Sequence, residues 1–497
     1  MSNQRRSLVL VTIDCLRADH CGFHGYPRPT TPFLDKLAEQ AFVLPTALIA
    51  GAPTYYSLPA ILASRMPLAL GRDVIGLAPG ETTLASVLRE AGYVTGAFSA
   101  ANPYISSRFG YEQGFDVFED FLGSGKPPSK STASSVEPVP KPPETRSKIN
   151  RTLSSAAHAI GLGAVYDEFY FQYCRRIASS APESADSLRR FPAAEAVVSR
   201  AIEWLETVGQ KPFFLWLHLM DPHSPYYPSL AAYEELTGRK LSAERALYLN
   251  EYWNRANISR ARLEHKKDDI VELYDAGVRA ADMQVARLLS HLRASGAWAD
   301  CAFALTADHG EEFLEHGRRY HAPVSLHAEI TRVPLLIRTP GAIKKDLPPD
   351  AFSQVHLAPT LLEMLDVPQP PSFQGSSLWG NIRDGLPWED AATMECVYGC
   401  TNPLRQEHRE RPRLLSVCQS GYKLILSMDG TSSEEFYDMQ ADPAEKHPMA
   451  ANDKEIRKQL FLRAAGHMRW VQKQQNAHLR LRARLRNIRV DLQSNPH

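Results

Sequence analysis

Short apolar runs recur along the chain, and each is followed by polar residues. Four of them, 7–14, 212–219, 301–306 and 333–338, are unbroken rather than alternating. Uninterrupted runs rich in aliphatic and aromatic residues are typical of strands that are buried on both faces of a parallel sheet. We therefore predict four buried strands at these positions.

The segments between these runs carry apolar residues at helical spacing. Helices are predicted over 31–40, 83–91, 193–208 and 268–295. An early proline marks the start of the first, and a glycine follows the end of the second. Strands that alternate with helices predict an α/β fold, in which a central, mostly parallel sheet is sandwiched by helices.

Two segments interrupt this alternation. Residues 123–148 are rich in proline, serine and lysine and are typical of a solvated insertion. A helical, cap-like segment is predicted over about 149–190. We assign both segments to one large domain that spans residues 1–380.

Beyond residue 380 the pattern becomes that of an antiparallel sheet. The runs 422–426 and 435–437 flank a turn at Asp429-Gly430 and predict a β-hairpin. We therefore predict a smaller β-containing subdomain over 381–450. A basic helical tail is predicted over 451–497.

The composition excludes several classes of protein. Among 497 residues, 56 Lys and Arg balance 56 Asp and Glu, and 44% are hydrophobic. Such a chain is too apolar to be disordered throughout, and its neutral total argues against a surface built for nucleic acid. We expect no signal peptide and no membrane span. Seven scattered cysteines argue against a disulfide framework, so we expect a reduced, cytoplasmic protein.

Polar clusters follow three of the predicted strands, and each cluster offers aspartate and histidine. The clusters begin at Asp14, at His218 and at Asp308. Each acidic residue alone could cap a helix. Three strand ends with the same residue types instead indicate ligands that converge on one ion, and Asp with His suits Zn²⁺, Mn²⁺ or a similar cation.

A segment rich in hydroxyl groups, 49–67, offers a nucleophile. A hydroxyl beside a divalent cation can lose its proton and attack an ester. The local sequence leaves the choice between Thr54, Ser57 and Ser64 open, since most such hydroxyls only form turns.

These motifs resemble, in order, those of the sulfatase family within the alkaline phosphatase superfamily. The similar segments are 12–32, 212–223, 306–317, 333–337, 354–362 and 436–443. The resemblance implies a central mixed sheet between helices and a smaller C-terminal β-containing subdomain. It also implies a divalent metal and a covalent intermediate in the hydrolysis or transfer of a sulfate or phosphate ester.

The resemblance also assigns site residues by motif. Asp14, Asp308 and His309 resemble the metal ligands, and Thr54 takes the place of the nucleophile. His223 and His321 resemble the histidines that bind the transferring group or protonate the leaving group. We therefore expect one divalent ion, Zn, Mn or Ca, with Thr54 bound to it.

Four further residues are candidates for substrate binding. They are Arg17, Tyr55, His218 and His316. Core packing would equally explain Tyr55, and an ion pair with Asp19 would explain Arg17. Glu312 is a candidate to accept a hydrogen bond from a ligand histidine.

The chain departs from the family at its nucleophile. A typical sulfatase has Cys or Ser followed by Pro and Arg, the signal for conversion to formylglycine, whereas this chain has Thr54 and Leu58. Cys15 replaces a second metal-binding Asp, and His309 replaces an Asn. These departures favour phosphate esters or diesters. The alternatives are a sulfatase that acts without formylglycine, a phospho-group transferase, and an inactive binding protein. The expected substrate is a small-molecule or glycan-type anionic ester, and a homo-oligomer is compatible with the sequence.

Overall fold

The computed structural model describes residues 5–123, 165–166, 168–169, 171, 188–256, 258–428, 433–450 and 454–494, with side chains in the last segment described over 455–480. The insertion predicted over 123–148 lies almost entirely outside these residues, as does most of the cap-like segment over 149–190. The turn predicted at Asp429-Gly430 lies outside them as well.

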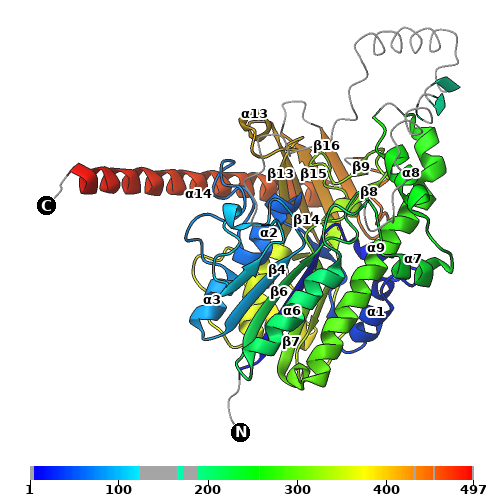
Figure 1. Cartoon of the computed structure of the whole chain (residues 1–497). Helices are drawn as coiled ribbons and strands as arrows, with labels where there is room; N and C mark the ends of the chain where they lie inside the picture. The colour runs from blue at the N-terminus through cyan, green and yellow to red at the C-terminus, as the bar shows by residue number, and fades with distance from the viewer. Residues whose placement is uncertain are drawn as a thin grey trace.

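A seven-stranded sheet forms the centre of the fold (Figure 1). Its strands, in the order β2-β11-β7-β1-β6-β4-β5, are β2 (Phe42–Val43), β11 (Leu335–Arg338), β7 (Cys301–Ala307), β1 (Ser7–Ile13), β6 (Phe213–Leu219), β4 (Val94–Ser99) and β5 (Val117–Glu119). The five from β7 to β5 are parallel. Every residue of β1, β6 and β7 is buried, which explains their unbroken apolar sequences. The predicted mostly parallel central sheet is thus confirmed.

The run 333–338 does not form the single strand that we predicted. It is divided into β10 (Arg332–Val333) and β11, which belong to different sheets. Pro334 lies between them and has no N–H to donate to a neighbouring strand. β11 also runs antiparallel to β7, so the central sheet is mixed.

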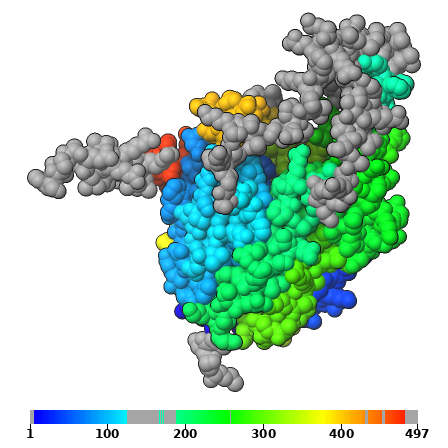
Figure 2. Space-filling view, in the orientation of Figure 1, coloured from blue at the N-terminus to red at the C-terminus, as the bar shows by residue number. Residues whose placement is uncertain are grey.

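Helices surround this sheet, and some of them pack on other helices rather than on its strands. They are α1 (Pro32–Ala38), α2 (Thr54–Ala63), α3 (Leu84–Glu90), α6 (Ala194–Val208), α7 (Leu230–Thr237), α8 (Ala243–Trp253), α9 (Arg260–Ala294), α11 (Leu357–Met364) and α12 (Trp379–Asp384). α6 packs on β4 and β6, α9 packs on α6, and α2 packs on α11. In Figure 2 the blue-to-cyan surface of the early residues meets the green surface of α6 on one face of the molecule.

A four-stranded antiparallel sheet follows, as the hairpin pattern predicted. It consists of β13 (Ala392–Val397), β14 (Arg413–Gln419), β15 (Tyr422–Ser427) and β16 (Glu434–Asp438). α14 (Lys454–Ser494) covers β14 and β15, where Leu460 and Ala464 join their apolar cluster. Further along α14, Val471 is buried and Gln475 donates a hydrogen bond to the backbone oxygen of Leu68. The end of the helix beyond these contacts projects from the body of the molecule (Figure 1). The C-terminal β subdomain and helix are therefore confirmed, whereas the boundaries at 380 and 450 stay predictions.

Short elements complete the described fold. They are β3 (Ala47–Leu48), β8 (Glu312–Phe313), β9 (Arg319–Tyr320), α10 (Ala328–Thr331), β12 (Phe352–Ser353) and α13 (Gln406–Arg409). Within the described residues, no helix combines the length and apolar character needed to cross a membrane.

Candidate active site

Two neighbouring parallel strands bring three candidate metal ligands together. Asp14 follows β1, and Asp308 and His309 follow β7, which is paired with β1. One ligand atom from each of the three lies within 4.8 Å of the others, and all three side chains are fully buried. Because parallel strands share one carboxyl edge, the clusters predicted at separate strand ends meet at one point.

Among the described residues, only one of the two carboxylate oxygens of Asp308 has hydrogen-bond donors. Its Oδ1 accepts hydrogen bonds from the backbone N–H groups of Cys15, at 3.3 Å, and of His309, at 2.9 Å. Its Oδ2 is buried and has no hydrogen-bond partner in the part of the chain that the structure describes. A buried, unpaired carboxylate oxygen is unfavourable unless a cation compensates it.

The His309 ring presents a lone pair to the same point. Nδ1 lies 2.9 Å from the backbone oxygen of Gly310, which can only accept, so Nδ1 carries the proton. In the neutral ring, Nε2 therefore has a free lone pair. It faces Asp308 Oδ2 at 3.5 Å and Asp14 Oδ1 at 3.8 Å. Three electron-rich atoms that converge in this way fit a divalent cation.

Asp14 is held in its ionised form by the side chains around it. Its Oδ2 accepts hydrogen bonds from Asn102 Nδ2 at 3.1 Å and His218 Nε2 at 3.2 Å. Burial alone would raise the pKa of the Asp14 carboxyl, but the nearby imidazoles of His223 and His218 outweigh burial and hold that pKa well below its usual range. An ionised carboxylate is the form that binds a metal.

Thr54 is the hydroxyl residue that faces this group. It is the first residue of α2, and its Oγ1 lies 3.2 Å from His309 Nε2. The other two candidates are engaged elsewhere. The hydroxyl of Ser57 donates to the backbone oxygen of Thr54, and that of Ser64 donates to the backbone oxygen of Val355. The helical conformation of this segment therefore singles out Thr54.

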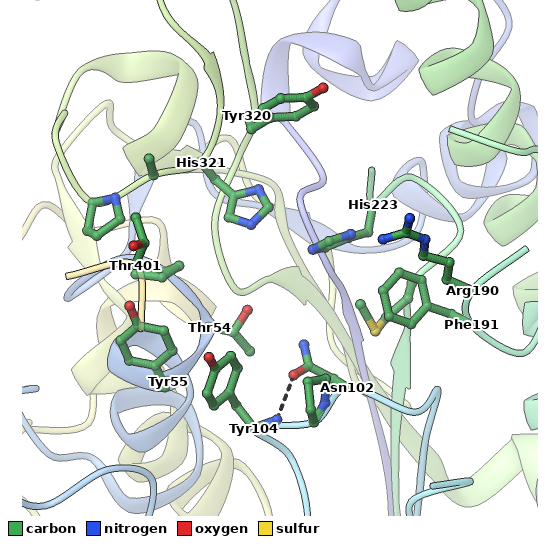
Figure 3. A pocket seen from close by; sticks show the side chains of 15 residues that line it. Thr54, Tyr55, Asn102, Tyr104, Arg190, Phe191, His223, Tyr320, His321 and Thr401 are labelled. Carbon is green, nitrogen blue, oxygen red and sulfur yellow. Dashed lines mark hydrogen bonds between the residues drawn. The ribbon is translucent and has the colours of Figure 1, made fainter. Parts of the chain in front are cut away.

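Two histidines stand beside Thr54 in the pocket (Figure 3). The ring centroid of His321 lies 4.5 Å from that of His309 and 4.9 Å from that of His223. His223 Nδ1 lies 2.5 Å from the backbone oxygen of Ser224 and donates to it, so its Nε2 is available to a ligand. His321 follows Tyr320, a residue with φ of +69°. This uncommon backbone conformation places His321 toward the pocket.

Glu311 orients His321, a role for which the sequence suggested Glu312. Glu311 is fully buried, and its Oε2 accepts a hydrogen bond from His321 Nδ1 at 2.8 Å. Its Oε1 accepts one from Tyr226 at 2.7 Å. Burial would raise the pKa of Glu311, but the charges of His321 and His223 outweigh it and lower that pKa. Glu312 instead accepts from backbone N–H groups.

The pocket above Thr54 has a volume of about 390 Å³. Besides Thr54, Tyr55, His223 and His321, its walls include Asn102, Tyr104, Arg190, Phe191, Tyr320 and Thr401 (Figure 3). These six residues were not predicted from the sequence, because they lie in loops or in the short strand β9 and form no motif. Asn102 lies three positions after the end of β4, and a polar residue beyond that buried strand was the one available signal.

Three predicted substrate-binding residues do not line this pocket. Arg17 forms ion pairs with Asp19 and Glu315, each at 2.7 Å, in line with the ion-pair alternative, and its role in substrate binding stays a prediction. His218 is fully buried behind Asp14 and orients that carboxylate. His316 belongs to a separate cluster described below. Tyr55 does line the pocket, as the substrate-binding prediction requires.

Cys15 has the character of a small buried side chain. Burial, followed by the charge of Glu311, raises the pKa of the Cys15 thiol well above its usual range. The thiol is therefore protonated and donates to Asp14 Oδ1 at 3.0 Å.

His316 joins the large domain to the antiparallel subdomain. Its Nδ1 donates to Glu329 Oε1 at 2.7 Å, and its Nε2 donates to the backbone oxygen of Glu445 at 2.8 Å. Its ring stacks on that of His327 with centroids 3.7 Å apart. Because both ring nitrogens face acceptors, the ring is charged and contributes to stability rather than to the pocket.

We expect this charge to make folding stability depend on pH. Burial disfavours the charged ring, but the hydrogen bond that His316 donates to Glu329 outweighs it and raises the pKa of His316 from 6.5 to about 9. The folded-state pKa is the higher one, so the contribution is complete below pH 6.5 and is lost as the pH rises through 9. Melting temperatures between pH 6 and 10 should fall by a few degrees more in wild type than in His316→Gln. Equal falls in both proteins would contradict the charged ring.

Comparison with known proteins decides the family. The model of the family described as "Sulfatase" matches residues 6–367. This chain belongs to the sulfatase family. A second model, described as the C-terminal part of N-sulphoglucosamine sulphohydrolase, matches residues 315–468. The predicted membership of the sulfatase family is confirmed, and the chain is a sulfatase-family ester hydrolase.

Two curated relatives are sulfatases. The N-acetylglucosamine-6-O-sulfatase of Bacteroides thetaiotaomicron is 30% identical over 211 residues, 41% of this chain and 36% of that protein. The chain therefore matches about a third of that relative's length. The arylsulfatase of Clostridium perfringens is 23% identical over 470 residues, which cover 88% of this chain and 89% of the relative.

Solved structures show the same fold. A structure in complex with its substrate D-glucosamine-2-N,6-O-disulfate is 18% identical, with a TM-score of 0.66, over 95% of this chain and 99% of that one. The phosphonate monoester hydrolase of Agrobacterium radiobacter is 17% identical, with a TM-score of 0.63, over 95% of this chain and 96% of that one.

These comparisons correct our preference for phosphate esters and diesters. The relatives are mainly sulfatases, so they favour the alternative of a sulfatase over a phosphoester hydrolase. The preference rested on Thr54 in place of the usual nucleophile and on the changes at Cys15 and His309, and these side chains do not determine whether sulfur or phosphorus is attacked.

Proposed function

We propose that this protein hydrolyses sulfate esters without formylglycine, with Thr54 as the nucleophile and one divalent cation as cofactor. The observation that carries the proposal is the 3.2 Å contact between Thr54 Oγ1 and His309 Nε2, within the buried group of Asp14, Asp308 and His309. Membership of the sulfatase family supports the ester class. A glycan or other small ring-containing molecule fits the aromatic walls of the pocket.

The chain's own residues suggest how the reaction proceeds. Thr54 Oγ1 gives its proton to water and attacks the sulfur atom, and the bond from sulfur to the leaving oxygen breaks. His223 or His321 protonates that oxygen, since both rings face the pocket. Water then hydrolyses the sulfate ester formed on Thr54. Because α2 begins at Thr54, the positive end of its helix dipole lies near the sulfate group and stabilises its negative charge.

Asp14, Asp308 and His309 would hold the cation, and Thr54 would lie beside it. When bound, a divalent cation lowers the pKa of a neighbouring hydroxyl and neutralises charge on the ester oxygens. A ligand set of two carboxylates and one imidazole suits Zn²⁺, Mn²⁺ and Ca²⁺ to different degrees, so we propose one divalent ion without choosing among the three.

Hydrolysis of phosphate or phosphonate esters is the second candidate. It is favoured by Thr54, because a threonine hydroxyl can form a phospho-threonine intermediate, and by the similar fold of the phosphonate monoester hydrolase. Transfer of a phospho-group to another acceptor would use the same intermediate. An inactive binding protein would have no chemical reason to keep Thr54 beside three converging ligands.

A side-by-side assay tests the proposal. The purified protein should be assayed with 4-nitrophenyl sulfate, 4-nitrophenyl phosphate, a phosphodiester and a phosphonate monoester, each with Ca²⁺, Mn²⁺ and Zn²⁺. We expect the highest kcat/KM with the sulfate and no turnover after chelation. A higher kcat/KM for any phosphorus ester would replace the proposal by the second candidate.

A further inference from the structure

Arg190 differs from the arginine beside it. Arg189 is held in place, because its Nη2 pairs with Asp221 Oδ1 at 2.9 Å and its Nε donates to the backbone oxygen of Tyr227. Arg190 is exposed and forms no hydrogen bond or ion pair with any described residue, yet it lines the pocket above Thr54. Its positive charge is therefore available to a ligand.

No acidic side chain among the residues that line the pocket offsets this charge. The fifteen lining residues include Arg190, His223 and His321 but no aspartate or glutamate. Asp221 lies in the adjoining groove, but its oxygens are taken by Arg189 and by the backbone N–H of Ala194. Arg190 is thus a fixed positive charge in a lining without acidic side chains, which favours an anionic group at the Arg190 end of the pocket.

Arg190 lies at the opposite end of the pocket from Thr54. Figure 3 shows Arg190 and Phe191 on the far side of His223 as seen from Thr54. Phe191 packs edge-on against His223, with ring centroids 5.1 Å apart. This contact joins the end of the pocket that contains Arg190 to the end that contains Thr54. A ligand whose ester reaches Thr54 would thus extend past His223 toward the guanidinium.

We infer that the substrate carries a second anionic group, a sulfate or a carboxylate, which Arg190 binds while the ester lies at Thr54. This inference rests on the proposed function and narrows its substrate class to polyanions. The planar guanidinium matches the paired oxygens of either group. Phe191, Tyr104 and Met220 supply apolar surface for the ring that joins the two groups. Because Arg190 is exposed, the contribution should be modest and should weaken with salt.

Matched substrates and variants test this inference. Arg190→Gln and Arg190→Lys should be assayed with 4-nitrophenyl sulfate, with the same ester bearing a ring carboxylate, and with one bearing a second sulfate. We expect Arg190→Gln to raise KM for the two doubly charged esters by about tenfold, with kcat unchanged, and to change the singly charged ester less than twofold. Arg190→Lys keeps the positive charge and should therefore raise KM for these esters less than Arg190→Gln does. The ratio between the two doubly charged esters distinguishes carboxylate from sulfate.

Arg405→Gln is the matched control, because Arg405 is exposed, lies outside the pocket lining and should leave all three KM values unchanged. If Arg190→Gln raised KM equally for singly and doubly charged esters, or raised KM for neither, the inference would be overturned. Failure of the proposed function gives a different result, since wild type would then turn over no sulfate ester. In that case the same comparison with singly and doubly charged phosphate esters decides whether Arg190 binds a second anion.

Discussion

Replacing Thr54 by alanine is expected to lower kcat/KM for a sulfate ester by at least about a thousandfold. The substitution removes the hydroxyl that lies 3.2 Å from His309 Nε2, and with it the oxygen that would form the covalent intermediate. Thr54 is the first residue of α2 and its side chain does not cap that helix, so the fold should be retained. Steady-state kinetics together with circular dichroism check both parts of this prediction.

Two variants of the same helix serve as controls. Thr54→Ser keeps the hydroxyl and should retain much of the activity. Ser57→Ala removes a neighbouring hydroxyl whose partner is a backbone oxygen, and it should change kcat/KM little. Turnover by Thr54→Ala at the wild-type rate, or a comparable loss in Ser57→Ala, would show that Thr54 is not the nucleophile.

The second large effect is expected from Asp308→Asn. The amide can still accept from the backbone N–H groups of Cys15 and His309, but it removes the negative charge and the unpartnered Oδ2. We expect loss of the bound metal and a fall in kcat/KM of at least about a thousandfold. Elemental analysis of the purified protein and kinetics with added metal measure these two quantities.

Thermal stability separates this effect from a folding defect. Metal at about one hundred times its Kd should stabilise wild type by about 2.7 kcal/mol, and should leave Asp308→Asn unchanged. Without metal, the variant should be at least as stable as wild type, because it removes repulsion between the buried carboxylates of Asp14 and Asp308. Asp19→Asn changes an acid that pairs with Arg17 outside the ligand group, and should keep metal binding. Full metal content in Asp308→Asn would contradict the ligand assignment.

Much of the fold follows from local pattern. β1, β6 and β7 have unbroken apolar sequences because every residue in them is buried, and such runs are visible without any coordinates. The hairpin of β15 and β16 was predictable for the same reason, since alternation and a turn are local signals. The division of 333–338 into two strands was not predicted, although Pro334 was visible, because pairing with different sheets is a long-range choice.

The candidate ligands were found from their positions after strands, whereas their partners were not. Glu311 was passed over in favour of Glu312, since adjacent residues point in different directions and the sequence does not show which one faces His321. His316 looked like a site residue because it follows His309 closely. The turn between them carries it to Glu329 and to the C-terminal subdomain instead.

The sequence alone therefore determined the α/β class, the family resemblance and the residue types at the ends of β1 and β7, because these depend on local periodicity and contiguous motifs. The tertiary structure decided which hydroxyl faces His309. Among the described residues, it also decided which carboxylate oxygen lacks a partner and which arginine is left unpaired at the pocket. Those features depend on contacts between residues far apart in the chain, and such contacts exist only when the strands, α2 and the loops pack together.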